Sequence, residues 1–181
     1  MATRVVLTYA DFAAWPADGK RYELHEGEIS ATAAPRPRHQ LVIGNLYLIL
    51  AQHVRRLALG EVFLSPIDVI LSNITVLEPD LVYVEAACLG QVSARGIEGP
   101  PTLVVEVLSP GTASADRGIK LQLYARYGVP HYWIVDSDAR TIETLRLTDR
   151  TYEAGPRLAG TVPAALPPFP DLVLDPAAVW R

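Results

Sequence analysis

Two carboxylates stand in apolar stretches of the chain, where an unpaired charge is costly. Glu106 interrupts the apolar run Leu103–Leu108, and Asp80 follows Pro79 at the start of an apolar segment that continues to Val84. A buried carboxylate is normally paired, hydrogen-bonded or bound to metal. Carboxylates on two neighbouring strands suit Mg²⁺ or Mn²⁺, because these hard cations prefer oxygen ligands. We therefore expect Asp80 and Glu106 to form a metal site.

Lys120 is the candidate basic residue of this site. It belongs to a helix predicted after the Glu106 strand, beside an apolar stripe that includes Leu123 and Tyr124. A divalent cation activates water and neutralises charge on a phosphate, and a lysine stabilises the developing charge further. The combination of Asp80, Glu106 and Lys120 is therefore suited to phosphodiester hydrolysis.

Each of these residues also has a structural interpretation. Glu106 could pair with a buried arginine or with backbone donors, and Asp80 could be a turn residue after proline. Lys120 could be a solvent-exposed partner of Asp116 at the i, i+4 spacing, worth about 0.2–0.5 kcal/mol. The sequence leaves these alternatives open.

Residue periodicity predicts an α/β fold with a mixed sheet. Thr8 and Asp11 form a capping-box pattern that opens a short helix. Helical spacing of apolar residues predicts a long helix over residues 39–57, closed by Gly60, and Thr112 or Ser114 opens another helix that ends at Tyr127. Strands are predicted at residues 21–24, 29–32, 61–65, 67–71, 80–84, 103–108, 131–136 and 141–147.

The remaining segments are expected to be less regular. Residues 25–28 form the turn of an N-terminal hairpin. We expect its acidic residues Glu23, Glu26 and Glu28 to be mainly solvated, with contact of one of them with the metal as the alternative. Residues 90–101 are rich in glycine and proline and are predicted to form a mobile loop. The segment 156–170 is predicted to be irregular, followed by a terminal helix that docks on the body.

Length and composition indicate one globular domain. The 181 residues are half apolar and one fifth charged, which is ordinary for a single domain. We expect it to span residues 1–181, with a core at about 20–147 and a proline-rich C-terminal tail at 156–181. Cys88 is the single cysteine, which excludes an intramolecular disulfide. Without a membrane-length apolar run or a signal-peptide pattern, we expect a cytoplasmic protein with no membrane partner.

The charge balance argues mildly against nucleic acid as a partner. The net charge is −4 and the sequence pI is about 5.5, whereas nucleic-acid-binding proteins usually present a basic face. Four arginines nevertheless lie in one stretch, and a bound cation adds positive charge at a site. They are Arg36, Arg38, Arg55 and Arg56.

Short motifs are spaced along most of residues 8–136. They are Arg21–Ile29, His39, Pro66–Ile70, Glu78–Val84, Val104–Pro110, Asp116–Lys120, Tyr124 and Gly128–Asp136. Their order and spacing resemble those of a large bacterial family of restriction-endonuclease-like proteins with the PD-(D/E)XK nuclease fold. The resemblance implies a core of a mixed central sheet flanked by helices, with an N-terminal hairpin.

This resemblance also implies a function and a site. It implies a DNA endonuclease that uses Mg²⁺ or Mn²⁺, with Asp80 and Glu106 as the motif carboxylates. A homodimer is a separate candidate assembly. The usual lysine two positions after the glutamate is absent, because Leu108 stands there. The resemblance implies that this lysine has moved to the following helix as Lys120. Asp68 and His39 match further positions, and either could border the site.

Two other functions remain open. The first is a catalytically weak or inactive binding module with the nuclease fold, which the acidic balance and Leu108 favour. The second is a structural dimer subunit, suggested by an aromatic group at Tyr124, Tyr127, Tyr132 and Trp133. Nucleophilic catalysis by serine is not indicated, because the sequence has no GxSxG motif.

Overall fold

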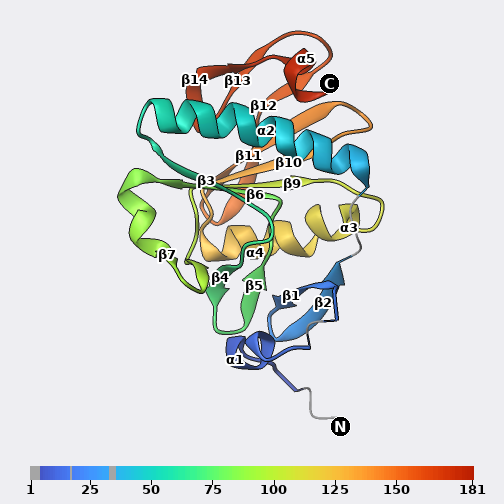
Figure 1. Ribbon diagram of the computed structural model, residues 1–181, viewed down its shortest axis with the longest axis vertical. Helices are drawn as coiled ribbons and strands as arrows, with labels where there is room; N and C mark the ends of the chain where they lie inside the picture. The colour runs from blue at the N-terminus through green and yellow to red at the C-terminus, as the bar shows by residue number, and fades with distance from the viewer. Residues whose placement is uncertain (1–4, 17, 33–35) are drawn as a thin grey trace.

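A six-stranded mixed sheet forms the centre of the molecule, as seen in a computed structural model that describes residues 5–16, 18–32 and 36–181 (Figure 1). Its strand order is β12-β11-β10-β9-β6-β3. β9 and β10 are parallel, while the other neighbours are antiparallel. The predicted α/β fold with a mixed sheet is therefore confirmed. The bounds are β3 Gly60–Leu64, β6 Leu81–Glu85, β9 Leu103–Val107, β10 His131–Asp136, β11 Thr141–Thr148 and β12 Thr151–Ala159.

Helices cover both faces of this sheet. Figure 1 shows α2 (Pro37–Arg56) across one face and α4 (Ile119–Tyr127) across the other. Successive strand residues point to opposite faces, so Val105 of β9 packs in the core below α2, whereas Val104 packs with Leu123 of α4. Among the described residues, no helix is long and apolar enough to cross a membrane.

A second sheet holds the N-terminal hairpin, as predicted. Its strand order is β2-β1-β5-β4-β8-β7, and α1 (Tyr9–Ala13) packs beside it. The Thr8 and Asp11 side chains form the predicted capping box at the start of α1. The bounds are β1 Arg21–His25, β2 Glu28–Thr32, β4 Val69–Ser72, β5 Thr75–Leu77, β7 Val92–Ser93 and β8 Gly96–Glu98.

Two segments are more regular than the sequence predicts. The expected loop at 90–101 contains the end of the short helix η1 (Ala86–Gln91) and the strands β7 and β8, because β8 pairs in parallel with β4. The expected irregular segment at 156–170 contains the end of β12 and the hairpin of β13 (Ala164–Leu166) and β14 (Phe169–Leu174). The predicted terminal helix is α5 (Pro176–Val179), and its docking is confirmed by the fully buried Val179.

Two predicted helix boundaries are also corrected. Gly60 does not close α2; Leu57 caps that helix, and Gly60 begins β3 with a φ of +143°. The helix predicted up to Tyr127 is broken into α3 (Ala113–Asp116) and α4. Gly118 lies in the break, where a Cβ atom would come 2.7 Å from the backbone oxygen of Ser114. Glycine is therefore needed for the turn between the two helices.

Candidate active site

Asp80 and Glu106 lie beside each other on the face of the central sheet that α4 covers. β6 and β9 are antiparallel, with Leu81 opposite Val105, so one step further along the register Asp80 comes opposite Glu106. Opposed residues on antiparallel strands have Cβ atoms about 4.5–5.5 Å apart. The backbone N–H of Val107 donates to Oδ2 of Asp80 at 2.8 Å. The structure thus brings the two predicted carboxylates together.

Lys120 reaches the same place from the first turn of α4. Its ammonium lies 2.9 Å from Oε1 of Glu23, 3.0 Å from Oε1 of Glu106 and 3.4 Å from Oδ1 of Asp116. The Lys120 side chain is only 5% exposed, so the alternative of a solvent-exposed ion pair is wrong. Tyr124, one turn further along α4, donates its hydroxyl to the same Glu106 oxygen at 2.8 Å.

Glu23 is a buried member of this cluster that the sequence does not reveal. A solvated hairpin is predicted for the glutamates of residues 23–28, yet Glu23 is 3% exposed. Its Oε1 accepts the backbone N–H of Glu78 at 2.9 Å, and its Oε2 lies 3.1 Å from Nε2 of His25. The next residue, Leu24, is buried against α1. Both faces of β1 are therefore covered, which an alternating pattern cannot indicate.

Glu26 ties the turn of the hairpin to the far end of α4. Its Oε1 accepts the hydroxyls of Tyr127 at 2.8 Å and Thr75 at 3.0 Å. Its Oε2 accepts a hydrogen bond from the Arg126 guanidinium at 2.7 Å. Glu26 is thus held by hydrogen bonds while its side chain remains 32% exposed, and Glu28 is exposed as predicted. The hairpin and α4 are held together both at the carboxylate cluster and at this tie.

The clustered charges shift pKa values in opposite directions. Burial raises the pKa of Glu106 well above its usual range; Lys120 opposes this shift, and neighbouring carboxylates add to it. Burial likewise raises the pKa of Asp116. At Glu23 burial is outweighed by Lys120 and by His25, which lower the pKa of this carboxyl to about 2. Desolvation opposes the charge of Lys120, but the surrounding carboxylates raise its pKa well above the usual value, so the ammonium stays charged.

Of the two residues predicted to border the site, His39 contacts it. Its Nε2, in the first turn of α2, lies 3.2 Å from Oδ2 of Asp80. Asp68 lies in a separate surface hollow of about 380 Å³, which Glu78 also lines. Partial burial and the charge of Glu78 raise the pKa of Asp68 to about 6. Among the described residues, no contact joins Asp68 to Asp80 or Glu106.

The carboxylate oxygens of Asp80 and Glu106 are of the chemical type that binds a hard divalent cation. Protein donors occupy Oδ2 of Asp80 and Oε1 of Glu106. The hydrogen bonds found among the described residues leave the second oxygen of each carboxylate without a protein donor. Carboxylate oxygens are ligands that Mg²⁺ prefers. Within the described ranges, however, no three His, Cys, Asp or Glu side chains are already arranged as a metal-binding group, so a cation needs water or a moving side chain to complete its coordination.

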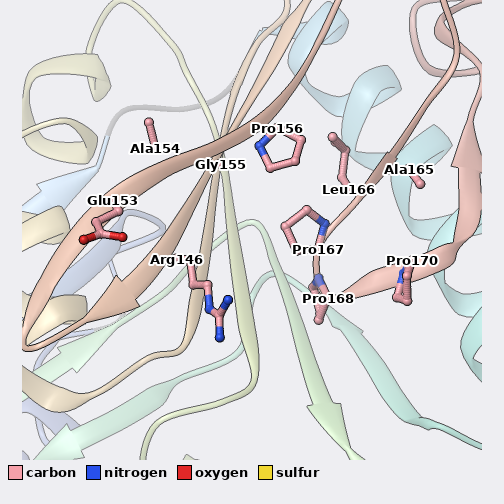
Figure 2. A pocket seen from close by; sticks show the side chains of 10 residues that line it. All are labelled: Arg146, Glu153, Ala154, Gly155, Pro156, Ala165, Leu166, Pro167, Pro168 and Pro170. Carbon is pink, nitrogen blue, oxygen red and sulfur yellow. The ribbon is translucent and has the colours of Figure 1, made fainter.

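A larger groove elsewhere carries none of this chemistry. Its volume is about 590 Å³, and it lies between β12 and the segment that contains β13 and β14 (Figure 2). Figure 2 shows Arg146 and Glu153 on one side and the rings of Pro167 and Pro168 on the other. Arg146 and Glu153 are its only charged lining residues in the described part of the chain, and both are exposed. We call this hollow the proline groove.

The mixed sheet, the paired carboxylates and the adjacent lysine define a protein of the restriction-endonuclease-like class. The sequence matches the Uma2 family, described as "Putative restriction endonuclease", over residues 9–177, and the chain belongs to that family. The resemblance inferred from the motifs is therefore confirmed. No curated protein matches the chain.

A solved structure shares the fold. It is the crystal structure of a protein from Anabaena variabilis ATCC 29413, described as "a putative nuclease belonging to DUF820". The TM-score is 0.79 at 17% sequence identity, and the match covers 96% of this chain and 97% of that chain. The restriction-endonuclease-like fold predicted from the sequence is thereby confirmed.

Proposed function

We propose that the chain is a metal-dependent endonuclease that hydrolyses phosphodiester bonds of DNA with Mg²⁺ or Mn²⁺. The observation that supports this most is the position of Asp80 opposite Glu106, with the Lys120 ammonium 3.0 Å from Glu106. Membership of a restriction-endonuclease family supports a nuclease function. The acidic oxygens suit the cation, and the charged lysine suits a phosphate.

In this proposal each residue has a separate task. Asp80 and Glu106 would hold the cation, while His39 contacts Oδ2 of Asp80 and Tyr124 donates to Oε1 of Glu106, which fixes the orientation of the two carboxylates. A bound divalent cation supplies positive charge that activates water and stabilises charge on the phosphate. Lys120 donates a hydrogen bond to a phosphate oxygen, because its raised pKa keeps the ammonium charged.

Local positive charge supports DNA as the substrate despite the net charge of −4. Arg36 and Arg38 are exposed at the start of α2, next to His39 and thus near Asp80. The first turn of α2 contains no acidic residue, so the positive end of the helix dipole is not offset there. Arginine side chains at this position are suited to contact the phosphates that flank the cleaved bond.

A plasmid-nicking assay with the purified protein tests the proposal. Wild type is expected to convert supercoiled plasmid to nicked circles with MnCl₂ or MgCl₂ and not with EDTA. Glu106→Gln is expected to abolish nicking, because a neutral amide is a poor ligand for a hard cation. Glu153→Gln, the same substitution in the proline groove, is the matched control and is expected to nick like wild type.

The outcomes distinguish the two leading functions. No nicking by wild type with any divalent ion would favour the binding module with a nuclease fold. Equal nicking by wild type and by Glu106→Gln, with similar melting temperatures, would indicate a contaminating nuclease. Nicking that Glu106→Gln loses, while the melting temperature is retained, would support the assignment of the centre.

A further inference from the structure

Arg21 is a partly exposed cation on the same face of the hairpin as the buried cluster. It stands two positions before Glu23 in β1, and side chains two positions apart in a strand point to the same face. Glu23 uses that face to contact the Lys120 ammonium at 2.9 Å. The side chain of Arg21 is 26% exposed, whereas those of Glu23 and Lys120 are 3% and 5% exposed. Arg21 therefore extends from the cluster toward solvent.

Glu78 holds the guanidinium of Arg21 in a fixed orientation. Nε donates to Oε2 of Glu78, and Nη2 donates to the Glu78 backbone oxygen at 3.1 Å. The backbone N–H of Glu78 in turn donates to Oε1 of Glu23 at 2.9 Å, so a chain of contacts runs from Arg21 through Glu78 and Glu23 to Lys120. A guanidinium has further N–H donors on Nη1, and within the described ranges these donors have no hydrogen-bond acceptor. They are therefore available to a ligand.

The guanidinium also lies near Asp80. Burial alone would lower the pKa of Arg21, but the hydrogen bond to Glu78 and the charges of Glu78, Asp80 and Glu23 raise it. Arg21 is therefore a charged neighbour of Asp80 that belongs to the start of β1. His39, at the start of α2, lies 3.2 Å from Oδ2 of the same carboxylate. Asp80 is thus adjacent both to the hairpin and to the basic start of α2.

We propose that Arg21 binds a phosphate of the DNA backbone beside the Asp80–Glu106 centre, through the N–H groups that Glu78 does not occupy. This inference rests on the proposed function and extends it, because neither the motifs nor the comparisons give Arg21 a task. The planar, charged guanidinium matches a phosphate in geometry and in charge. Because Glu78 and Glu23 join Arg21 to Lys120, this contact also positions the DNA backbone relative to the Lys120 ammonium.

DNA binding without cleavage tests this inference. Fluorescence anisotropy of a labelled duplex is measured in EDTA over a range of NaCl concentrations. Each phosphate contact contributes about −0.9 to the slope of log K against log [NaCl], so Arg21→Met is expected to make the slope less negative by about 0.9. Duplexes of unrelated sequence should lose affinity equally, because a phosphate contact carries no sequence information. Arg21→Lys keeps the charge and is expected to keep the slope.

Arg55→Met is the matched control. Arg55 forms an exposed ion pair with Glu61 in the last turn of α2. At about 1.5 Å per residue it lies roughly 24 Å along the helix from His39. Its loss removes a paired arginine far from the centre, so the salt dependence of DNA binding should match that of wild type.

The outcomes separate this inference from the proposed function. A wild-type slope in Arg21→Met, whatever its melting temperature, would mean that Arg21 is only the structural partner of Glu78 and would overturn the inference. A reduced slope in Arg21→Met, with a wild type that nicks plasmid with no divalent ion, would support the phosphate contact and overturn the proposed hydrolysis. Failure of wild type to bind any duplex would overturn both the contact and DNA as the substrate.

A crystal of the wild-type chain with a DNA duplex, grown in EDTA, gives a second test that does not depend on a folded variant. A phosphate oxygen within about 2.7–2.9 Å of a guanidinium nitrogen of Arg21 supports the inference. A duplex bound over the cluster while Arg21 contacts Glu78 alone contradicts it.

Discussion

The carboxylate cluster and the proline groove are opposites in shape and in chemistry. The groove is open and has a volume of about 590 Å³, but its charged side chains are exposed and its other lining residues are mostly apolar. In the cluster, Glu23, Asp80, Glu106, Asp116 and Lys120 are each at most 5% exposed. Concave apolar pockets are the usual first guess for a binding site. In this protein the cost of burying charge is the stronger guide, because a fold keeps such a cluster only with compensation.

Removal of the Lys120 ammonium should have the largest effect on stability. Lys120→Met keeps the length of the side chain but leaves three buried carboxylates without their ammonium. We expect the free energy of unfolding at pH 7 to fall by about 3–5 kcal/mol, and the fall to be smaller at pH 5, where Glu106 and Asp116 are more fully protonated. Urea unfolding at the two pH values measures both effects. Arg146→Met in the proline groove is the control; an equal loss in both variants would remove the contrast between the two regions.

The proline groove should affect stability and not chemistry. Leu166 lines the groove floor, is 1% exposed and belongs to the core below α2. Leu166→Ala should lower the free energy of unfolding by about 2–5 kcal/mol through the cavity that it leaves. Nicking at a temperature where the variant stays folded should remain at the wild-type level. A large loss of nicking by folded Leu166→Ala would mean that the groove takes part in the function.

Loss of a single hydrogen bond at the centre should have a moderate effect. Tyr124→Phe removes the hydroxyl that donates to Glu106 at 2.8 Å and leaves the ring packed against Tyr132. We expect a loss of about 1 kcal/mol in stability and a nicking rate about tenfold lower, because Glu106 is less well oriented. Tyr152→Phe, which removes a hydroxyl bonded to the Val129 backbone oxygen, should match the change in stability with no change in rate.

The smallest effect is expected at Asp68, and it should appear as a pH dependence. Partial burial and the Glu78 charge raise its pKa from 3.8 to about 6 in the folded chain. The folded state therefore binds this proton more tightly than the unfolded state, so its contribution to stability is lost as the pH rises from about 4 to 6. Asp68→Asn should remove that loss. Melting temperatures of wild type and variant that change in parallel over this range would contradict the assignment.

The clustered residues that the sequence singles out are those whose local surroundings carry a signal. Glu106 is conspicuous because it interrupts an apolar strand, and its position fixes where to look for Asp80 and Lys120. Glu23 gives no such signal, because its burial depends on α4 covering the second face of a hairpin that pairs with distant strands. The burial of Asp116 is not evident from the sequence for a related reason, because it depends on the break at Gly118, which directs this side chain toward the cluster.

Prolines caused the main error in the fold. Pro156 and Pro170 disfavour strand prediction, because proline cannot donate a hydrogen bond to a neighbouring strand. Pro156 is nevertheless tolerated in β12, which lies at the edge of the central sheet, and Pro170 lies in β14 of a two-stranded sheet. Each of these two strands has a neighbouring strand on one side only, so a residue without a backbone N–H group is tolerated there. Which strands lie at an edge is a property of the whole topology and cannot be inferred from a local segment.

The hydrogen bonds between Glu26 and the end of α4 limit when the carboxylate cluster can form during protein synthesis. Glu26 contacts Arg126 and Tyr127, which lie 100 and 101 residues later in the chain, and closing so long a loop is slow compared with local folding. The hairpin therefore leaves the ribosome long before its partners. Nascent chains stalled before Lys120 should show no Mn²⁺-dependent nicking of plasmid. The proposed nuclease activity is therefore absent until most of the chain has been translated.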